Sequence, residues 1–216
     1  MICRRVVPSV VASVAGFALA AATAASEVPP FPSPRPAELE AALSAAPAAL
    51  RAEATLWATG PRGFERVREG SNGVTCLVEH EPGGGWAPIC WDREGSEKIL
   101  PVALERERLR VAGKADAAID AEIAAGFADG RFRAPERTGI SWMLSDSNWV
   151  FDGERVIHFH PHLMIYAPYV TNAEVAGDPR DPARPWVLAE GSPHAYLIVA
   201  PATPASAAGE SHAGHR

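Results

Sequence analysis

The stretch from Gly70 to Trp91 reads GSNGVTCLVEHEPGGGWAPICW and has the pattern of a β-hairpin. Its first arm, Val74–Val78, is rich in β-branched residues, which favour strands. The glycine run at 83–85 suits a tight turn, because glycine adopts positive φ without strain. Residues 87–91 then return as the second arm. We therefore expect this hairpin to form part of the central sheet.

Two cysteines support one particular register of this hairpin. If paired residue numbers add up to 166, Leu77 faces Ile89, the turn falls inside the glycine run, and Cys76 lies opposite Cys90. The third cysteine of the sequence, Cys3, lies in the predicted export signal described below, so the mature chain has two. An even number of cysteines in an oxidising compartment indicates a disulfide. We predict a Cys76–Cys90 bond, with the two Cα atoms within about 7 Å of each other. Pro88 must then face away from the ladder or mark a bulge.

The first 25 residues have the pattern of an export signal. Two arginines precede an uncharged stretch that ends near Ala22-Thr23-Ala24, a small-x-small cleavage site. A charged start, an apolar middle and a small-residue site define a secretory signal. We expect residues 1–25 to be removed, leaving an N-terminus close to Ser26 in the periplasm or outside the cell. The alternative is an uncleaved anchor, because the uncharged run is nearly long enough to span a bilayer.

Charge and length narrow the class of protein. The chain of 216 residues has a formal charge of −6, and loss of Arg4 and Arg5 with the signal brings the mature chain to about −8. An acidic protein is a poor partner for nucleic acid or anionic membranes. We expect no nucleic-acid partner, a mature form outside the membrane, and a small molecule or a protein as the partner. The mature length suits one domain.

Helical signals are found in three segments. A short helix is predicted over 37–43, after a proline that suits a first turn. A second helix is predicted over 102–112 and ends at the glycine that follows. A third begins at Asp116, which can cap it, and closes at Gly130. The last two are expected to form a central helical hairpin.

Strand signals lie on both sides of this helical block. The predicted strands are 54–58, 64–67, 74–78, 87–91, 140–144, 156–159, 163–167, 186–189 and 195–199. This order predicts a single α+β domain over 37–200 with an antiparallel sheet, and it loosely resembles PAS-like and profilin-like domains. A proline-rich, extended lead-in is expected at 26–36. The tail at 201–216, which contains His212 and His215, is expected to be disordered.

Three segments carry a resemblance to known sequences. They are GSNGVTCLVEH at 70–80, GFADGRFRAPERTGISWMLSD at 126–146 and HLMIYAPY at 162–169. In these segments the chain resembles a family of uncharacterised exported bacterial proteins, over roughly 54–199. The resemblance implies an exported, single-domain protein. It implies no activity and no functional residues.

A histidine cluster is the main candidate site. His158, His160 and His162 alternate in VIHFHPH, and alternate residues of a strand share one face. With His194 as a fourth ligand, they could bind a divalent transition metal such as Zn, Cu, Ni or Fe. The alternative is a set of partly exposed histidines at a strand end, because Pro161 cannot donate to a sheet ladder and can end the strand.

A second candidate site consists of Arg131, Arg133 and Arg137, which could hold a carboxylate or a phosphate. The alternative is a solvated linker that offsets the acidic charge.

No motif in the chain specifies a reaction. The sequence lacks a nucleophile elbow, a phosphate-binding glycine loop and a C-x-x-C pair. Two hypotheses therefore stay open. The first is a non-catalytic exported domain that binds a small ligand or a partner. The second is a metal-binding protein or metal-dependent enzyme centred on the four histidines, so the sequence leaves open whether the chain is an enzyme.

Overall fold

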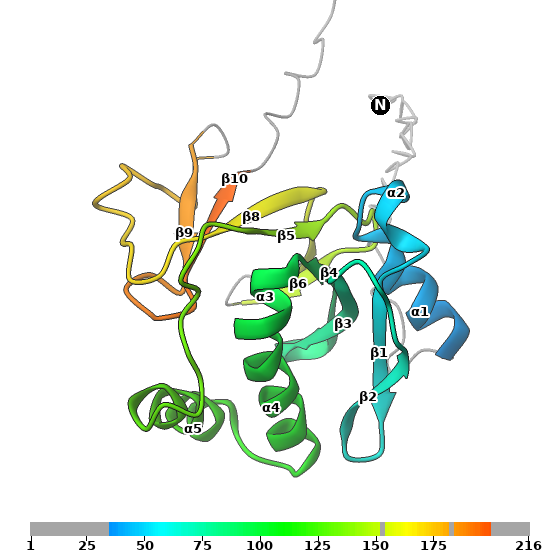
Figure 1. The fold of residues 1–216 in the computed structure, drawn as a ribbon. Coiled ribbons are helices and arrows are strands. Elements are labelled where there is room, and N and C mark those ends of the chain that lie inside the picture. The colour runs from blue at the N-terminus through cyan, green and yellow to red at the C-terminus, as the bar shows by residue number, and fades with distance from the viewer. Residues whose placement is uncertain (1–34, 152–153, 182–183, 200–216) are drawn as a thin grey trace, which may run out of the picture.

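The computed structural model describes residues 35–151, 154–181 and 184–199 (Figure 1). The predicted export signal, most of the lead-in and the tail with its two histidines lie outside these residues. The helical elements are α1 (Arg35–Ser44), α2 (Ala48–Arg51), the 3₁₀ turn η1 (Pro82–Gly84), α3 (Arg93–Lys98), α4 (Leu100–Val111) and α5 (Asp116–Ala128). The strands are β1 (Thr55–Gly60), β2 (Gly63–Arg68), β3 (Thr75–Glu81), β4 (Gly85–Trp91), β5 (Ile140–Met143), β6 (Trp149–Phe151), β7 (Val156–His158), β8 (His162–Tyr166), β9 (Trp186–Leu188) and β10 (Tyr196–Val199).

One sheet runs through the molecule in the order β2-β1-β3-β4-β5-β8-β10-β9, and the short pair β6 and β7 attaches to β4. The α+β class is confirmed. The sheet is mixed rather than antiparallel, because β1 and β3 pair in parallel at Thr55–Thr75 and Leu56–Cys76. The hairpin to β2 occupies one edge of β1, so the returning chain adds β3 at the other edge in the same direction as β1.

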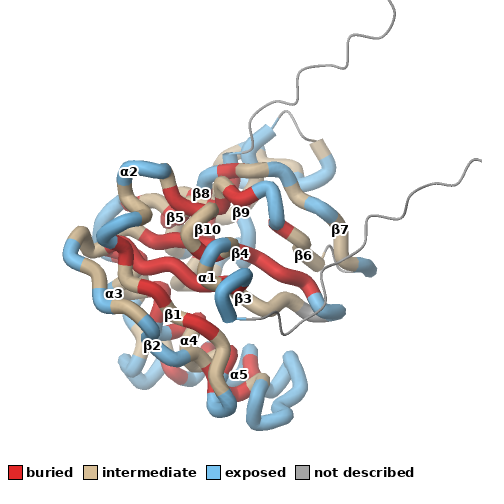
Figure 2. Tube along the Cα trace, turned by 90° about the vertical axis from the view of Figure 1, so that its right-hand side faces the viewer, coloured by how far each residue is buried: buried red, intermediate tan, exposed pale blue. Residues whose placement is uncertain are grey.

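Helices cover both faces of the sheet (Figure 1). On one face Ala42 of α1, with Ala45 and Ala46 of the turn that follows it, contributes to a core with the disulfide and Trp86. On the other face, Ile99, Leu100 and Ala103 of the α3–α4 region pack against Leu77, Ile89 and Trp91. Figure 2 shows the buried residues concentrated along β3 and β4, whereas α5 is mostly exposed.

Helix α5 packs on α4 through the predicted stripe, in which Ile119 and Ile123 are buried and Phe127 is half-buried. Figure 1 shows α4 from the side and α5 nearly end-on, so the two helices cross. The predicted helical hairpin is therefore not confirmed, and neither is the PAS or profilin resemblance. A crossing keeps the short apolar stripe of α5 on α4 while its other faces stay in solvent.

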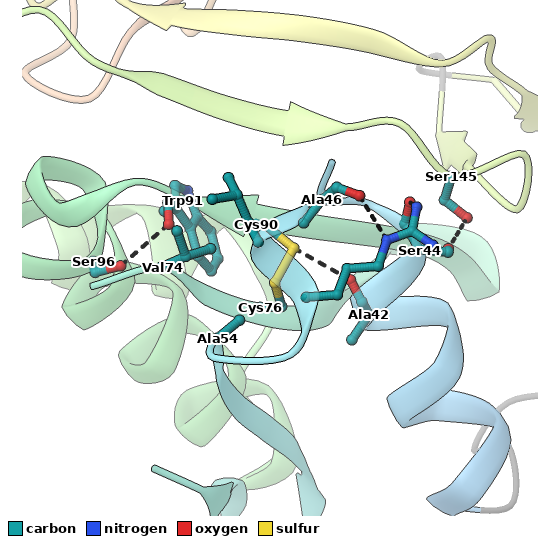
Figure 3. Close-up of a disulfide and its surroundings, with 12 residues drawn as sticks. Ala42, Ser44, Ala46, Ala54, Val74, Cys76, Cys90, Trp91, Ser96 and Ser145 are labelled. Atoms are coloured by element: carbon teal, nitrogen blue, oxygen red, sulfur yellow. Dashed lines mark hydrogen bonds between the residues drawn. A yellow bond between two sulfur atoms is a disulfide. The ribbon is translucent and has the colours of Figure 1, made fainter. Parts of the chain in front are cut away.

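The predicted disulfide is confirmed. The Cys76–Cys90 bond joins β3 to β4 with 4.1 Å between the Cα atoms, and both residues are fully buried under α1 (Figure 3). The register is also the predicted one, with Leu77 opposite Ile89. Gly83 supplies the positive φ of the turn, at 68°. Local pattern and turn chemistry were thus sufficient to place this hairpin.

Pro88 faces away from the β3 ladder, the first of the two alternatives predicted for it. The Cα spacing at Cys76–Cys90 is that of a non-hydrogen-bonded pair, and Val78–Pro88, two residues further along, is a pair of the same kind. The missing N–H of Pro88 therefore points to the opposite edge of β4. There β4 pairs with β5 from Cys90 onward and with β6 at Trp86, and Pro88 lies between these two partners.

Several local details differ from the prediction. The lead-in ends before Arg35, because Pro36 is accommodated inside the first turn of α1, where no N–H is needed. Asp116 is the first helical residue of α5 and not its cap, which is Ala115. Helix α3, which Asp92 caps through the Gly95 amide at 2.9 Å, and strand β6 were not predicted. Gly113 and Gly130 end their helices with positive φ, as predicted.

Candidate functional site

A cavity of about 340 Å³ lies between β3, α4 and the loop that joins β9 to β10. Residues 77, 79 and 81 of β3 share one face, because alternate strand residues point the same way. Leu77 fills the core on this face, and the next two positions, Glu79 and Glu81, line the cavity. The remaining lining residues are Phe64, His80, Ile99, Val102, Ala103, Arg106, Leu188, Ala189, His194 and Tyr196.

Two further cavities adjoin this one. A space of about 150 Å³, walled mainly by β6, β8 and β10, shares Glu79, Glu81, Leu188 and Tyr196 with it. A third, of about 360 Å³ against α5, shares Arg106, Ala189 and His194. The 340 Å³ cavity and the 150 Å³ space together have the size and the largely apolar wall of a small-molecule site. We call these two spaces the sheet cavity.

Glu79 is the unusual residue of the sheet cavity. Burial, together with a smaller contribution from the charge of neighbouring Glu81, raises the pKa of its carboxyl from 4.5 to about 8. No hydrogen bond to this carboxyl comes from any residue in the described ranges. Glu81 likewise has a pKa raised by burial, although the Arg106 charge and a hydrogen bond from the Phe151 amide oppose the rise.

Basic groups near the two carboxyls do not neutralise them. Arg106 forms an ion pair with Asp120, with 2.8 Å between nitrogen and oxygen. Burial, with a smaller contribution from the Arg106 charge, lowers the pKa of His194 to about 4, so this imidazole is neutral at pH 7. The His194 ring stacks on Phe127 at 5.4 Å, and its Nδ1 is buried with no hydrogen-bond partner in the part of the chain that the structure describes.

A buried polar network borders the cavity where β1 and β3 separate. His80 Nδ1 lies 2.9 Å from Glu107 Oε1, and Arg110 holds both oxygens of Glu107 at 2.8 Å. His80 Nε2 lies 3.2 Å from Thr59 Oγ1. Glu38 of α1 accepts hydrogen bonds from the Thr59 amide and hydroxyl, both at 2.7 Å. The network thus ties α1, β1, β3 and α4 together across the sheet.

This network has the connectivity of a hydroxyl–imidazole–carboxylate chain but not the chemistry of a catalytic triad. In a triad the hydroxyl gives its proton to the imidazole. Here the Thr59 hydroxyl donates to Glu38 instead, and the His80 and Glu107 side chains are each only 3% exposed. We therefore assign the network a structural role.

The predicted histidine cluster is not assembled in one place. Strand β7 ends at His158 and β8 begins at His162, because Pro161 interrupts the ladder between them. His158 and His160 are exposed, with 6.0 Å between their ring centroids. His162 is buried beside Phe159 and lines the smaller chamber of the sheet cavity. His194 borders the larger chamber.

No group of three or more His, Cys, Asp or Glu side chains that could hold a metal ion is found within 35–151, 154–181 and 184–199. The metal hypothesis therefore has no preformed ligand set in this part of the chain.

The three arginines of the second predicted site have separate surroundings. Arg131 pairs with Asp129 at 2.9 Å, and Arg137 pairs with the buried Glu94 at 3.1 Å. Arg133 is exposed. Two of the three cations are thus occupied by different carboxylates and do not converge on one point.

The chain matches no family model, no curated protein and no solved structure. Among the helices of the described ranges, none is long and apolar enough to cross a membrane. The chemistry of the sheet cavity is therefore the basis for a functional assignment.

Replacing Glu79 by glutamine is expected to flatten the pH dependence of stability. Below pH 4.5 the carboxyl is protonated in both the folded and the unfolded state. As the pH rises from 4.5 to about 8, the unfolded state releases the proton and the folded state keeps it, so the wild type loses stability. Relative to Glu79→Gln, the free energy of unfolding of the wild type should fall by at most about 1.4 kcal/mol per pH unit.

Urea unfolding at a series of pH values measures this difference. Glu97→Gln, which makes the same change at an exposed position of α3, is the control and should keep the wild-type slope. Parallel profiles for wild type and Glu79→Gln between pH 4.5 and 8 would show that the Glu79 pKa is not raised.

The sequence did contain one signal for this site. Glu79 and Glu81 follow Leu77 at steps of two residues, so all three side chains lie on the same side of the strand, and Leu77 is buried there. Carboxylates on a buried side of a strand are uncommon unless they have a function or a partner. Arg106 and His194 gave no comparable signal, because only the packing of α4 and of the β9–β10 loop brings them to the cavity.

Proposed function

We propose that the mature protein is an exported binding domain that holds a small amphipathic molecule in the sheet cavity. The observation that carries this proposal is the combination of an apolar wall with a carboxyl group, that of Glu79, that lacks a hydrogen-bond partner within the described chain. Ligand sites are typically apolar clefts with a few polar groups that fix orientation. Phe64, Val102 and Leu188 provide apolar wall in the larger chamber.

The composition of the wall favours binding over covalent chemistry. Among the described residues that line the larger chamber there is no serine, threonine, cysteine or lysine, so its wall offers no aliphatic hydroxyl, thiol or amine nucleophile. Its hydroxyl group is that of Tyr196, which accepts a hydrogen bond from Trp91 at 3.1 Å and whose pKa is raised by burial. A group of this kind holds a ligand in place more readily than it attacks one.

Export is the second part of the proposal. The disulfide supports it, because such bonds persist in oxidising compartments. The N-terminal pattern of a charged start and an apolar stretch supports it independently. The intact mass of protein taken from the exported fraction is expected to correspond to a chain that begins near Ser26. A full-length mass in the membrane pellet would favour a retained anchor.

Blocking the cavity is expected to abolish binding. Leu188 is 42% exposed and lines both chambers, so the larger side chain of Leu188→Trp should occupy cavity space without overpacking the core. Three probes with one apolar body and different polar ends, phenylbutylamine, phenylbutanol and phenylbutyrate, are titrated calorimetrically into the mature protein. At least one should bind, and its affinity should fall about tenfold or more in Leu188→Trp.

Val199→Trp is the matched control, because Val199 is exposed to a similar extent, at 45%, and does not line the cavity. If no probe binds, or if Leu188→Trp and Val199→Trp bind equally well, the proposed site is wrong.

A further inference from the structure

Building on the proposed function, we propose that the polar end of the ligand is an organic cation, such as an ammonium group, held between the carboxylates of Glu79 and Glu81. Both residues come from β3 and face the same chamber. Both also line the adjoining smaller chamber, so a cation between them would lie where the two spaces meet. The inference concerns the charge of the ligand and not its full identity.

The hydrogen-bonding state of the two carboxyls favours a donor as their partner. An ionised carboxylate only accepts hydrogen bonds. Glu81 accepts one from the Phe151 amide, whereas Glu79 accepts none from the residues that the structure describes. A ligand ammonium group would supply up to three N–H donors and the opposite charge, which would make the ionised form of Glu79 stable inside the cavity.

The charged groups on the surrounding elements leave this site acidic. From α4, Arg106 faces the two carboxyls, but its guanidinium is already paired with Asp120. Glu107 of the same helix lies near enough to raise the pKa of Glu79 slightly, although Arg110 holds both of its oxygens. The two carboxyl groups of Glu79 and Glu81 therefore face one guanidinium, that of Arg106, which already has a carboxylate partner.

The titratable groups on the other walls are neutral near pH 7. Burial lowers the pKa of His194 in the β9–β10 loop and of His162 on β8. Burial raises the pKa of Tyr196 on β10. An anionic ligand would thus meet two carboxyls and no free positive charge on these walls, while a cation could also lie against the aromatic ring of Tyr196.

The three phenylbutyl probes test the charge directly, because they share one apolar body. Near pH 8, where Glu79 begins to ionise, phenylbutylamine is expected to bind the mature protein about tenfold or more tightly than phenylbutanol or phenylbutyrate. Its affinity should rise by about tenfold per pH unit below 8, because binding releases the proton of Glu79. Glu79→Gln should remove the preference, and Glu97→Gln should keep it.

The outcomes separate this inference from the proposed function. Equal binding of amine and alcohol, both lost in Leu188→Trp, would leave the cavity as a binding site and overturn the cation inference. Tighter binding of phenylbutyrate would also overturn it. Failure of every probe would overturn both proposals. Glu81→Gln provides a second variant, which should weaken phenylbutylamine binding as well.

Discussion

Replacing Glu107 by alanine is expected to lower the free energy of unfolding by about 3 to 5 kcal/mol, because it leaves buried polar partners without their acceptor. The Glu107 side chain is 3% exposed and accepts from both His80 and Arg110. Only Arg110, at 38% exposure, can turn to water when the carboxylate is removed. Urea unfolding near pH 7 measures the effect.

Glu105→Ala is the matched control for this experiment. Glu105 pairs with Arg108 on the same helix with the same spacing, but Arg108 is 56% exposed, so this loss should cost less than about 1 kcal/mol. Equal effects of Glu105→Ala and Glu107→Ala would show that the buried network contributes no special stability.

The stabilising effect of Glu107 should also depend on pH. Burial alone would raise the pKa of Glu107, but the hydrogen bonds from His80 and Arg110 outweigh it and hold the pKa below 4.5. The stabilisation is therefore fully present above pH 4.5 and is lost as the pH falls through the lower pKa of the folded state. The difference in the free energy of unfolding between wild type and Glu107→Ala should therefore become smaller at acidic pH.

Removing the disulfide by Cys76→Ala and Cys90→Ala together is expected to cost about 3 kcal/mol of stability in the chain-entropy model. The bond closes a loop with a sequence separation of 14, which restricts the unfolded chain. Both cysteines are buried beneath α1, with Cys90 Sγ 3.3 Å from the Ala42 carbonyl oxygen, so some packing is lost as well (Figure 3). Guanidinium unfolding of the mature protein measures the loss.

Reduction of the wild type provides the control for the disulfide prediction. In denaturant with a reducing agent, wild type should lose the stabilisation that comes from the bond and exceed the double variant only by the packing of its two thiols. Thiol titration of the unfolded, unreduced mature protein should find no free thiol. Two reactive thiols per chain, or a double variant as stable as the oxidised wild type, would contradict the prediction.

Local sequence determined the parts of the fold in which neighbours in the chain are also neighbours in space. The β3–β4 register follows from the positions of Cys76 and Cys90 around a glycine turn, and the structure reproduces it. The ends of α4 and α5 follow from Gly113 and Gly130, which take the positive φ that other residues disfavour. In these cases the residues that stabilise the turn or the helix end lie only a few positions apart in the chain.

Tertiary structure decided what depends on contacts between distant segments. The parallel pairing of β1 with β3 follows from which edge β2 leaves open, and no residue pattern encodes that choice. The histidines of VIHFHPH alternate in sequence but are divided between two strands, because Pro161 cannot join the ladder. Sequence spacing alone therefore overestimated how closely these side chains would gather.

The sheet cavity shows the same division between local and long-range information. The strand period of two places Glu79 and Glu81 on the same side as Leu77, a relation set by sequence spacing alone once the strand continues past its predicted end at Val78. Only the tertiary structure decided that Arg106, His194 and Tyr196 enclose those carboxyls, because α4 and the β9–β10 loop reach them from far along the chain. The physical reason is that burial, which raises the pKa of Glu79, depends on the packing of all these elements together.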